Sequence, residues 1–270
     1  MTPPVSAGGP APEPPRVVVH ADAGVLARAA AARLITALVD AQGARGEASL
    51  VLTGGGIGVA LLRAVRTSPA ADAVNWSRVD VWWGDERFVP ADSPDRNDQQ
   101  AREALLAHVP VDPARVFPMG HLAEAGGGGG DGGGVAEPEA AAAAYAAALA
   151  ARAARAGSGS AVPAFDVLLL GLGPETHVAS IFPDSPAAVA TETVTAVRDC
   201  PKPPPTRVTL TFPALRAARE VWVIVAGEEK AEAVANALKP GADRVTFPAA
   251  GAVGRERTLW LVDRAAASRL

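Results

Sequence analysis

Short apolar runs alternate with longer segments of helical periodicity along most of this chain, and this alternation restricts the fold more than any other feature. Most of the runs are continuously apolar, which is typical of strands buried on both faces of a sheet. The runs that predict strands are residues 16–20, 49–52, 79–83, 115–119, 165–170, 207–210, 221–225 and 258–262. The pattern predicts an α/β fold with a doubly wound, largely parallel sheet and helices on both faces (Rossmann-like).

The segments between these runs have the features of helices. Asp22 is expected to cap a helix whose apolar residues recur at helical spacing as far as Leu38. Asn97 is expected to cap another helix, which continues to residue 108. Further helices are expected at residues 59–65, 137–155 and 228–238.

A chain of 270 residues is long enough to bury a sizeable core, and we expect one α/β domain over residues 16–270. Residues 1–15 are rich in Pro, Gly and Ala, and this composition predicts a disordered tail. A tract that is almost pure glycine predicts a flexible insertion at residues 125–135, because glycine loses the most backbone entropy on ordering and contributes nothing to a core.

Charge and composition exclude several classes of function. The 25 basic and 29 acidic residues leave a net charge of -4, so we expect no nucleic-acid partner. No apolar stretch approaches the roughly 20 residues needed to cross a bilayer, and the N-terminus lacks the pattern of a signal peptide, so we expect a cytoplasmic protein without membrane contact. The single cysteine, Cys200, cannot form an internal disulfide, and no zinc-binding spacing occurs, so no metal is expected.

Three loops follow predicted strands at the edge of the sheet where ligands bind in open α/β folds. In the first, Gly54, Gly55 and Gly56 come between the strand at 49–52 and a helix. Backbone amides at such a turn can hold a phosphate, aided by the helix dipole. The loop matches neither the dinucleotide-binding pattern nor a Walker motif, and an ordinary tight turn is an equal alternative.

The second loop places Asp85, Glu86 and Arg87 directly after the strand at 79–83. One interpretation is a solvated turn, since charge is readily exposed there. The other is that the two carboxylates orient the planar guanidinium of Arg87 toward a phosphate.

The third loop follows the strand at 165–170 and contains His177 with Glu175 two residues before it. A carboxylate in this position can orient the imidazole as a general base, although a lone histidine is more often structural. Arg207 begins the predicted strand at 207–210, and Lys230 lies at the start of the predicted helix at 228–238. Each is either an ordinary surface charge or a cation that helps to bind a phosphate at this edge of the sheet. Lys230 is one of three lysines, with Lys202 and Lys239, beside 22 arginines.

Taken in order, these pieces resemble the 6-phosphogluconolactonases, whose superfamily also includes the glucosamine-6-phosphate deaminases. The stretches that carry the resemblance are Leu52-Thr53-Gly54-Gly55-Gly56, residues 82–90 with Asn97, residues 171–183, residues 207–210 and Gly227-Glu228-Glu229-Lys230. The resemblance implies a monomeric doubly wound enzyme, without metal or organic cofactor. It implies that the enzyme hydrolyses a phosphosugar lactone, 6-phospho-D-glucono-1,5-lactone, to 6-phosphogluconate in the oxidative pentose phosphate pathway.

Under this resemblance, each candidate residue has an expected role. His177 is the base that activates water, and Glu175 orients it. The 6-phosphate is held by Arg87, Arg207, Lys230 and the amides of Gly54, Gly55 and Gly56, while Asp85, Glu86 and Asn97 support the site.

The chain departs from the family pattern at two places. Gly56-Ile57-Gly58 stands where the family commonly has Ser-Thr-Pro, so hydroxyls that would touch phosphate are missing. Glu175-Thr176-His177 replaces the usual Asp-Gly-His. We expect an ordinary backbone conformation at Thr176, because a positive φ would cost this residue about 1 kcal/mol or more.

Two alternatives are weaker. The deaminase branch typically carries Phe-Asn-Glu-Pro after its histidine, whereas residues 180–184 here lack the Asn-Glu pair. A sugar-phosphate sensor of a transcription factor would have a DNA-binding segment, and no helix-turn-helix precedes the first predicted strand.

Overall fold

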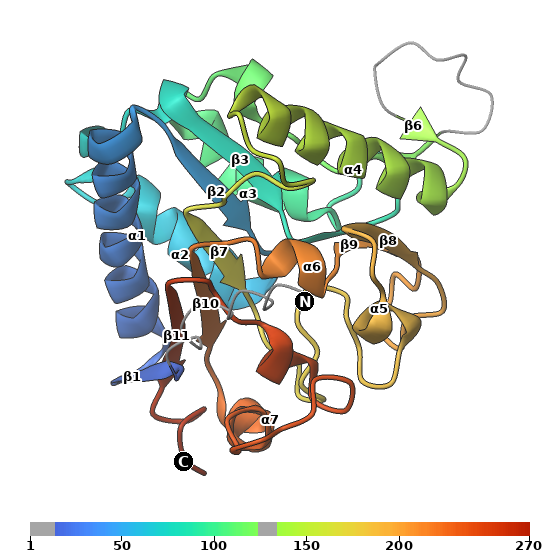
Figure 1. The fold of residues 1–270 in the computed structure, drawn as a ribbon. Coiled ribbons are helices and arrows are strands. Elements are labelled where there is room, and N and C mark those ends of the chain that lie inside the picture. Colours follow the sequence, from blue (N-terminus) through green and yellow to red (C-terminus); the bar gives the residue numbers. More distant parts are fainter. Residues whose placement is uncertain (1–13, 124–133) are drawn as a thin grey trace, which may run out of the picture.

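The structure is a computed structural model that describes residues 14–123 and 134–270 (Figure 1). Most of the tail predicted at residues 1–15 and of the insertion predicted at 125–135 lies outside the described residues. The end of that insertion, Gly134–Val135, forms the short strand β6, which pairs with β5 (His121–Leu122). Within the described ranges, no helix combines the length and the apolar character needed to span a membrane.

The core of the fold is a six-stranded sheet in which all neighbouring strands are parallel. Its order is β1-β11-β10-β7-β2-β3. The bounds are β1 (Arg16–His20), β2 (Ala48–Leu52), β3 (Val79–Trp83), β7 (Val167–Leu170), β10 (Glu220–Val225) and β11 (Arg257–Asp263). Every residue of β2, β3 and β7 is buried, as expected of strands covered on both faces of a sheet.

Helices cover both faces of this sheet, which confirms the doubly wound α/β prediction (Figure 1). Leu50 and Leu52 pack into one hydrophobic cluster while Val51 packs into the other, because successive side chains of a strand point to opposite faces. One face carries α1 (Ala23–Arg45), α2 (Gly55–Arg66) and α3 (Asn97–Ala104). The other carries α4 (Pro138–Arg155), α5 (Pro186–Val189), α6 (Phe212–Leu215) and α7 (Ala231–Ala237).

A second, antiparallel sheet joins β4 (Asp85–Arg87), β9 (Arg207–Leu210) and β8 (Val194–Val197). The strand predicted at residues 207–210 is therefore confirmed, but it lies outside the parallel sheet. In this arrangement Arg87 and Arg207 are register partners on adjacent strands. Two segments that are far apart in the sequence thus bring their arginines together.

The prediction of a strand at residues 115–119 is wrong. The chain forms a 3-10 turn at Pro113–Arg115 and then a single bridge from Val116 to Val81. Pro118 lacks the backbone N–H that a longer ladder would need, so pairing with β3 stops there.

Two predicted helices are shorter than expected, and one predicted cap is confirmed. The Asp22 side chain accepts a hydrogen bond from the Val25 amide and caps α1. Residues 97–108 form α3 and then a 3-10 turn at Leu106–His108. Residues 228–238 likewise divide into a 3-10 turn at Glu228–Lys230 followed by α7.

The strand order decides where a ligand can bind. From β2 the sheet continues to β3 on one side, whereas β7, β10 and β11 extend on the other. The loops that leave the carboxyl ends of β2 and β7 therefore diverge, and such a switch point opens a crevice between them.

Candidate active site

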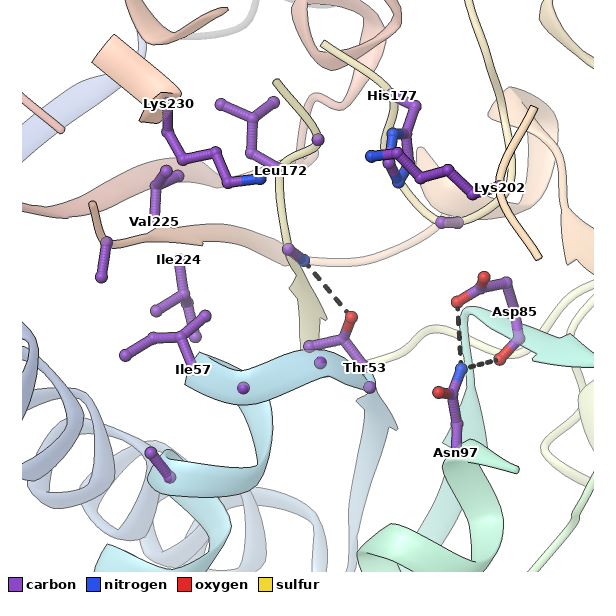
Figure 2. A pocket seen from close by; sticks show the side chains of 18 of the residues that line it. Thr53, Ile57, Asp85, Asn97, Leu172, His177, Lys202, Ile224, Val225 and Lys230 are labelled. Carbon is purple, nitrogen blue, oxygen red and sulfur yellow. Dashed lines mark hydrogen bonds between the residues drawn. The ribbon is translucent and has the colours of Figure 1, made fainter. Parts of the chain in front are cut away.

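A cavity of about 610 Å³ opens at the carboxyl ends of the parallel strands (Figure 2). Its wall is formed by the loops after β2, β7 and β10, the first turns of α1, α2 and α3, residues of β4 and β9, and the proline-rich loop before β9. Of the predicted site residues, those in the wall are Gly54, Gly55, Gly56, Asp85, Arg87, Asn97, His177, Arg207 and Lys230. Glu86 and Glu175 lie behind the wall and act on residues that line it.

The glycine run after β2 begins α2, and two of its members have a structural need for glycine. Gly54 flanks the helix, and no side chain caps the helix start. Gly55 has φ 83, a left-handed conformation that suits glycine. Gly54 faces the side chain of Asn97 at a distance that leaves no room for a Cβ atom. The cavity therefore meets bare backbone at a helix N-terminus, where the dipole favours an anion.

Asn97 and Asp85 form a polar pair on the cavity wall. The Asn97 side-chain amide donates to the Asp85 carbonyl at 2.8 Å, and Ser180 Oγ donates to Asp85 Oδ2 at 2.6 Å. Asn97 does not cap α3 as predicted, because it is itself the first helical residue. Its side chain connects the start of α3 to β4 through the hydrogen bond to Asp85.

The start of α3 is capped instead by Glu86. Its carboxylate accepts hydrogen bonds from the backbone amides of Asn97 at 2.7 Å and Asp98 at 2.9 Å. Arg96 lies 3.6 Å away, and both side chains are almost fully buried. Burial raises the pKa of Glu86 to about 7, against the opposing effect of Arg96 and the amides. Glu86 thus fixes the backbone of Asn97 at the start of α3.

The prediction that Asp85 and Glu86 orient the Arg87 guanidinium is wrong. From Arg87, the Glu86 carboxylate accepts only the backbone N–H, and the Arg87 guanidinium donates instead to the Asp95 carbonyl. The carboxylates have other partners because β4 pairs with β9 and α3 begins against Glu86. Arg87 nevertheless lines the cavity.

His177 lies on a tight turn that follows β7. The Gly173 amide donates to the His177 carbonyl at 3.0 Å, and a Cβ atom on Gly173 would lie 1.8 Å from His177 Nδ1. The imidazole stacks on Phe182 with 4.4 Å between ring centroids. Nδ1 is buried and lies 3.1 Å from Glu175 Oε1, but their alignment does not make a hydrogen bond. Nε2 is therefore the ring nitrogen left for a ligand.

Thr176 has φ 73, so the expectation of an ordinary backbone at this position is wrong. The Thr176 amide donates to the Gly173 carbonyl at 2.9 Å, and its carbonyl accepts from the Ala249 amide at 3.0 Å. These two hydrogen bonds hold the backbone in the conformation that glycine would adopt. The side chain is buried, and its hydroxyl has no hydrogen-bond partner among the described residues.

Lys202 also lines the cavity, although the sequence analysis did not select it. Its Nζ atom lies 3.0 Å from Glu175 Oε1 and 3.1 Å from Oε2. Burial tends to raise the pKa of Glu175, but the adjoining His177 and Lys202 lower it to about 2, so this carboxyl stays ionised. The scarcity of lysine and the run of prolines after Lys202 are the sequence signals that could have drawn attention to it.

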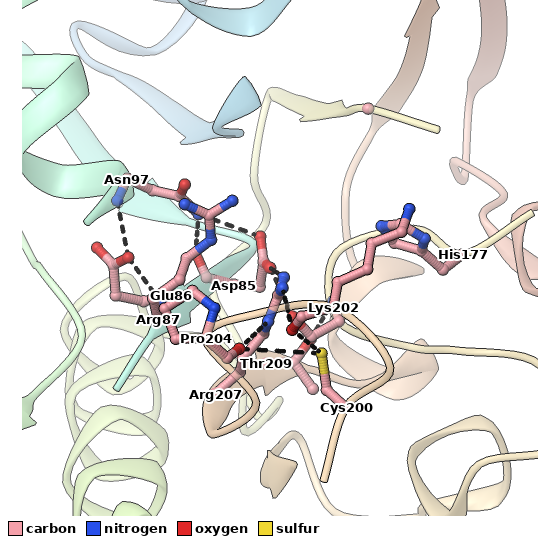
Figure 3. Close-up of polar contacts among 12 residues, drawn as sticks. Asp85, Glu86, Arg87, Asn97, His177, Cys200, Lys202, Pro204, Arg207 and Thr209 are labelled. Carbon is pink, nitrogen blue, oxygen red and sulfur yellow. Dashed lines mark hydrogen bonds and ion pairs between the residues drawn. The ribbon is translucent and has the colours of Figure 1, made fainter. Parts of the chain in front are cut away.

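Arg207 lines the cavity and also holds the loop that carries Lys202 (Figure 3). Its guanidinium donates to the carbonyls of Lys202 at 3.1 Å, Pro204 at 3.1 Å and Pro203 at 3.4 Å. Nη1 lies 3.9 Å from Asp85 Oδ2. Because Arg207 is almost fully buried, these contacts connect the antiparallel sheet firmly to the proline-rich loop.

Lys230 lies across the cavity from His177 and Lys202 (Figure 2). Burial and the charge of Lys202 lower the pKa of Lys230. The cavity thus combines an imidazole supported by a carboxylate with several cations and a helix N-terminus, a combination suited to chemistry on an anionic ligand. In the described part of the chain, no three His, Cys, Asp or Glu side chains gather where they could hold a metal ion.

Comparisons with known proteins agree with this chemistry. The family model for glucosamine-6-phosphate isomerases/6-phosphogluconolactonase matches residues 21–260. The chain is 57% identical over 257 residues to a 6-phosphogluconolactonase of Streptomyces coelicolor, covering 95% of each chain. It is 51% identical over 256 residues to a 6-phosphogluconolactonase of Mycobacterium tuberculosis, covering 94% of this chain and 98% of the other.

A solved structure shares the fold. The 6-phosphogluconolactonase of Trypanosoma brucei superimposes with a TM-score of 0.76 at 28% identity, covering 95% of this chain and 98% of the other.

Proposed function

The chain belongs to the glucosamine-6-phosphate isomerase/6-phosphogluconolactonase family, and we propose that it hydrolyses 6-phospho-D-glucono-1,5-lactone to 6-phospho-D-gluconate with His177 as general base. Relatives that are 57% and 51% identical to it are 6-phosphogluconolactonases, which are lactone hydrolases of the pentose phosphate pathway, and the chain belongs to the same enzyme class. The observation that carries the role of His177 is its place on the cavity wall, with Nδ1 turned to Glu175.

In the proposed reaction, water attacks the carbonyl carbon of the lactone while His177 Nε2 takes one of its protons. The tetrahedral intermediate carries a negative charge on the former carbonyl oxygen. When this oxygen re-forms its double bond, the bond from the carbonyl carbon to the ring oxygen breaks. The imidazolium returns its proton to the departing ring oxygen, so the products are a hydroxyl and a carboxylic acid, which ionises in water.

Glu175 serves as a positioning residue in this scheme. Its carboxylate lies beside Nδ1, and Lys202 holds it from the other side. A carboxylate in this place favours the tautomer that leaves Nε2 free to accept a proton, and it stabilises the imidazolium that forms.

The 6-phosphate is assigned to Lys230, Arg87, Arg207 and the amides of residues 54–56. These groups face the same cavity as His177, and each contributes a donor or a positive charge that suits a phosphate. Holding the phosphate at a fixed place would keep the lactone carbonyl within reach of the water. Asp85, Glu86 and Asn97 support this arrangement through the hydrogen bonds at the start of α3. A monomeric state and a cytoplasmic location stay predictions.

The decisive experiment measures proton release from freshly generated 6-phosphogluconolactone with and without the protein. The blank is essential because this lactone also opens spontaneously. A rate proportional to protein concentration is expected, whereas a rate equal to the blank would overturn the proposal. A parallel assay for ammonia from glucosamine 6-phosphate tests the deaminase alternative, for which no release is expected.

A further inference from the structure

The charge that develops on the lactone carbonyl oxygen needs a partner, and the structure assigns this role to Lys202. We propose that the Lys202 ammonium stabilises the oxyanion of the tetrahedral intermediate, in addition to holding Glu175. This inference rests on the proposed lactone hydrolysis and adds a catalytic residue to it.

The first reason is the position of the ammonium relative to the base. Lys202 Nζ lies 3.0 Å and His177 Nδ1 lies 3.1 Å from the same atom, Glu175 Oε1. The ammonium is therefore within two hydrogen-bond lengths of the imidazole, and both side chains line the cavity (Figure 2). In the described part of the chain, no other Lys or Arg forms an ion pair with Glu175. The ammonium and the imidazole thus border the same part of the cavity, where the lactone carbonyl would lie.

The second reason is that nearby backbone donors are already in use. The Gly171 amide donates to Thr53 Oγ1 at 3.3 Å, the Gly173 amide to the His177 carbonyl at 3.0 Å, and the Thr176 amide to the Gly173 carbonyl at 2.9 Å. The turn that carries His177 therefore does not offer these amides as an oxyanion hole. An ammonium has three N–H donors, and the two Glu175 oxygens occupy two of them, which leaves one for a substrate oxygen.

The third reason is that the backbone of Lys202 is fixed before any substrate binds. Arg207 donates to the carbonyls of Lys202, Pro203 and Pro204, and Cys200 Sγ lies 3.0 Å from the Lys202 carbonyl. The side chain itself is 38% exposed, so it is open to a ligand. A donor held in advance in this way stabilises developing charge without a cost of reorganisation in the transition state.

The test compares lysine variants in the lactone assay. Lys202→Met is expected to lower kcat about 10²- to 10³-fold with KM changed only a few-fold, as for the loss of an oxyanion donor. Lys202→Arg should recover part of the lost kcat because it keeps the charge. Lys239→Met is the matched control, since Lys239 is exposed and contacts Asn236. Thermal unfolding of each variant checks that the fold survives.

Three outcomes would overturn the proposal. A raised KM with a wild-type kcat in Lys202→Met would make Lys202 a phosphate ligand. Recovery of the lost kcat at alkaline pH would mean that Lys202 acts only by tuning His177 through Glu175. If Lys202→Met does not fold, a Lys202→Arg variant that folds but has less than a thousandth of wild-type kcat would show that a positive charge at this position does not stabilise the oxyanion. Failure of the proposed function is distinguishable, because the wild-type protein would then not accelerate hydrolysis.

Discussion

Gly54 and Asn97 are packed so closely that a Cβ atom on Gly54 would lie 1.8 Å from Asn97 Oδ1. Asn97 cannot simply turn away, because its amide donates to the Asp85 carbonyl and its backbone N–H donates to Glu86. The first turns of α2 and α3 can therefore pack against each other only because residue 54 has no side chain. This contact connects the glycine loop to the polar pair on the cavity wall.

Gly54→Ala is expected to displace Asn97 and the loop before α2. We expect kcat/KM to fall at least about tenfold, because misplacing groups that position a substrate by about an ångström is costly. Gly56→Ala is the matched control for stability, since a Cβ atom there meets nothing within 4 Å. Its unfolding midpoint should be close to that of the wild type. Wild-type kinetics in Gly54→Ala would contradict the proposed role of this contact.

Thr176→Gly is expected to stabilise the protein by about 1 kcal/mol. The left-handed backbone costs a residue with a side chain about 1–2 kcal/mol, and the unpaired buried hydroxyl adds to this. Two effects oppose this gain. One buried methyl group is lost, which costs about 0.8 kcal/mol. Glycine also loses more backbone entropy on folding than threonine does. Urea unfolding measures the difference. Thr176→Ala keeps the backbone strain and should gain less; a less stable Thr176→Gly would show that side-chain packing dominates.

His177→Ala is expected to lower kcat by about 10²- to 10⁴-fold, the range for loss of a general base. The fold should survive, although the stacking contact with Phe182 is lost. His108→Ala is a suitable control because His108 is exposed and outside the cavity wall. Enzyme-dependent hydrolysis at the wild-type rate in His177→Ala would remove His177 from the mechanism.

Lys230→Met is expected to act mainly on substrate capture. A phosphate is bound in both the ground state and the transition state, so KM should rise about tenfold or more while kcat changes less. Because the pKa of Lys230 is lowered, binding of 6-phosphogluconate should weaken at a lower alkaline pH than for an ordinary lysine. Calorimetric titration of wild type and variant across this range checks both points. An unchanged KM would rule out the phosphate assignment of Lys230.

Glu175→Gln tests the consequence of the low pKa of this carboxyl. The folded pKa of about 2 lies below the ordinary 4.5, so ionised Glu175 stabilises the fold above pH 4.5, and this contribution is lost as pH falls toward 2. Glu175→Gln should therefore be less stable than the wild type at pH 6, by about 1 kcal/mol after allowing for partial solvent exposure. The difference should shrink at pH 3. A difference that is constant with pH, measured by urea unfolding, would disprove this role.

Much of the fold was predictable from local pattern. The strands β1, β3 and β9 begin and end at the predicted residues, and Asp22 caps α1 as predicted. These features depend on apolar runs and on a hydrogen bond between residues that are close in the sequence. The predicted strand at residues 115–119 failed because its pairing depended on β3, a distant partner, and on the position of one proline.

The roles of the charged side chains were less predictable. Glu86 has partners at the start of α3 and Arg207 has partners in the proline-rich loop, and neither pairing follows from sequence spacing. Lys202 was missed for the same reason, since it meets Glu175 across 27 positions of the chain. Ionic and hydrogen-bond partners are chosen by proximity in space, which only the packed sheets and loops define.

Sequence alone determined the doubly wound architecture and the kind of chemistry, because hydrophobic periodicity and the order of the motifs are carried by neighbouring residues. Tertiary structure decided which charges meet. It placed Lys202 and His177 on one carboxylate oxygen of Glu175, and it held Thr176 in a left-handed conformation through hydrogen bonds to Gly173 and Ala249. The physical reason is that Lys202 and Ala249 lie far along the chain from residues 173–177, so their contacts with this turn depend on distances that arise only when the core is formed.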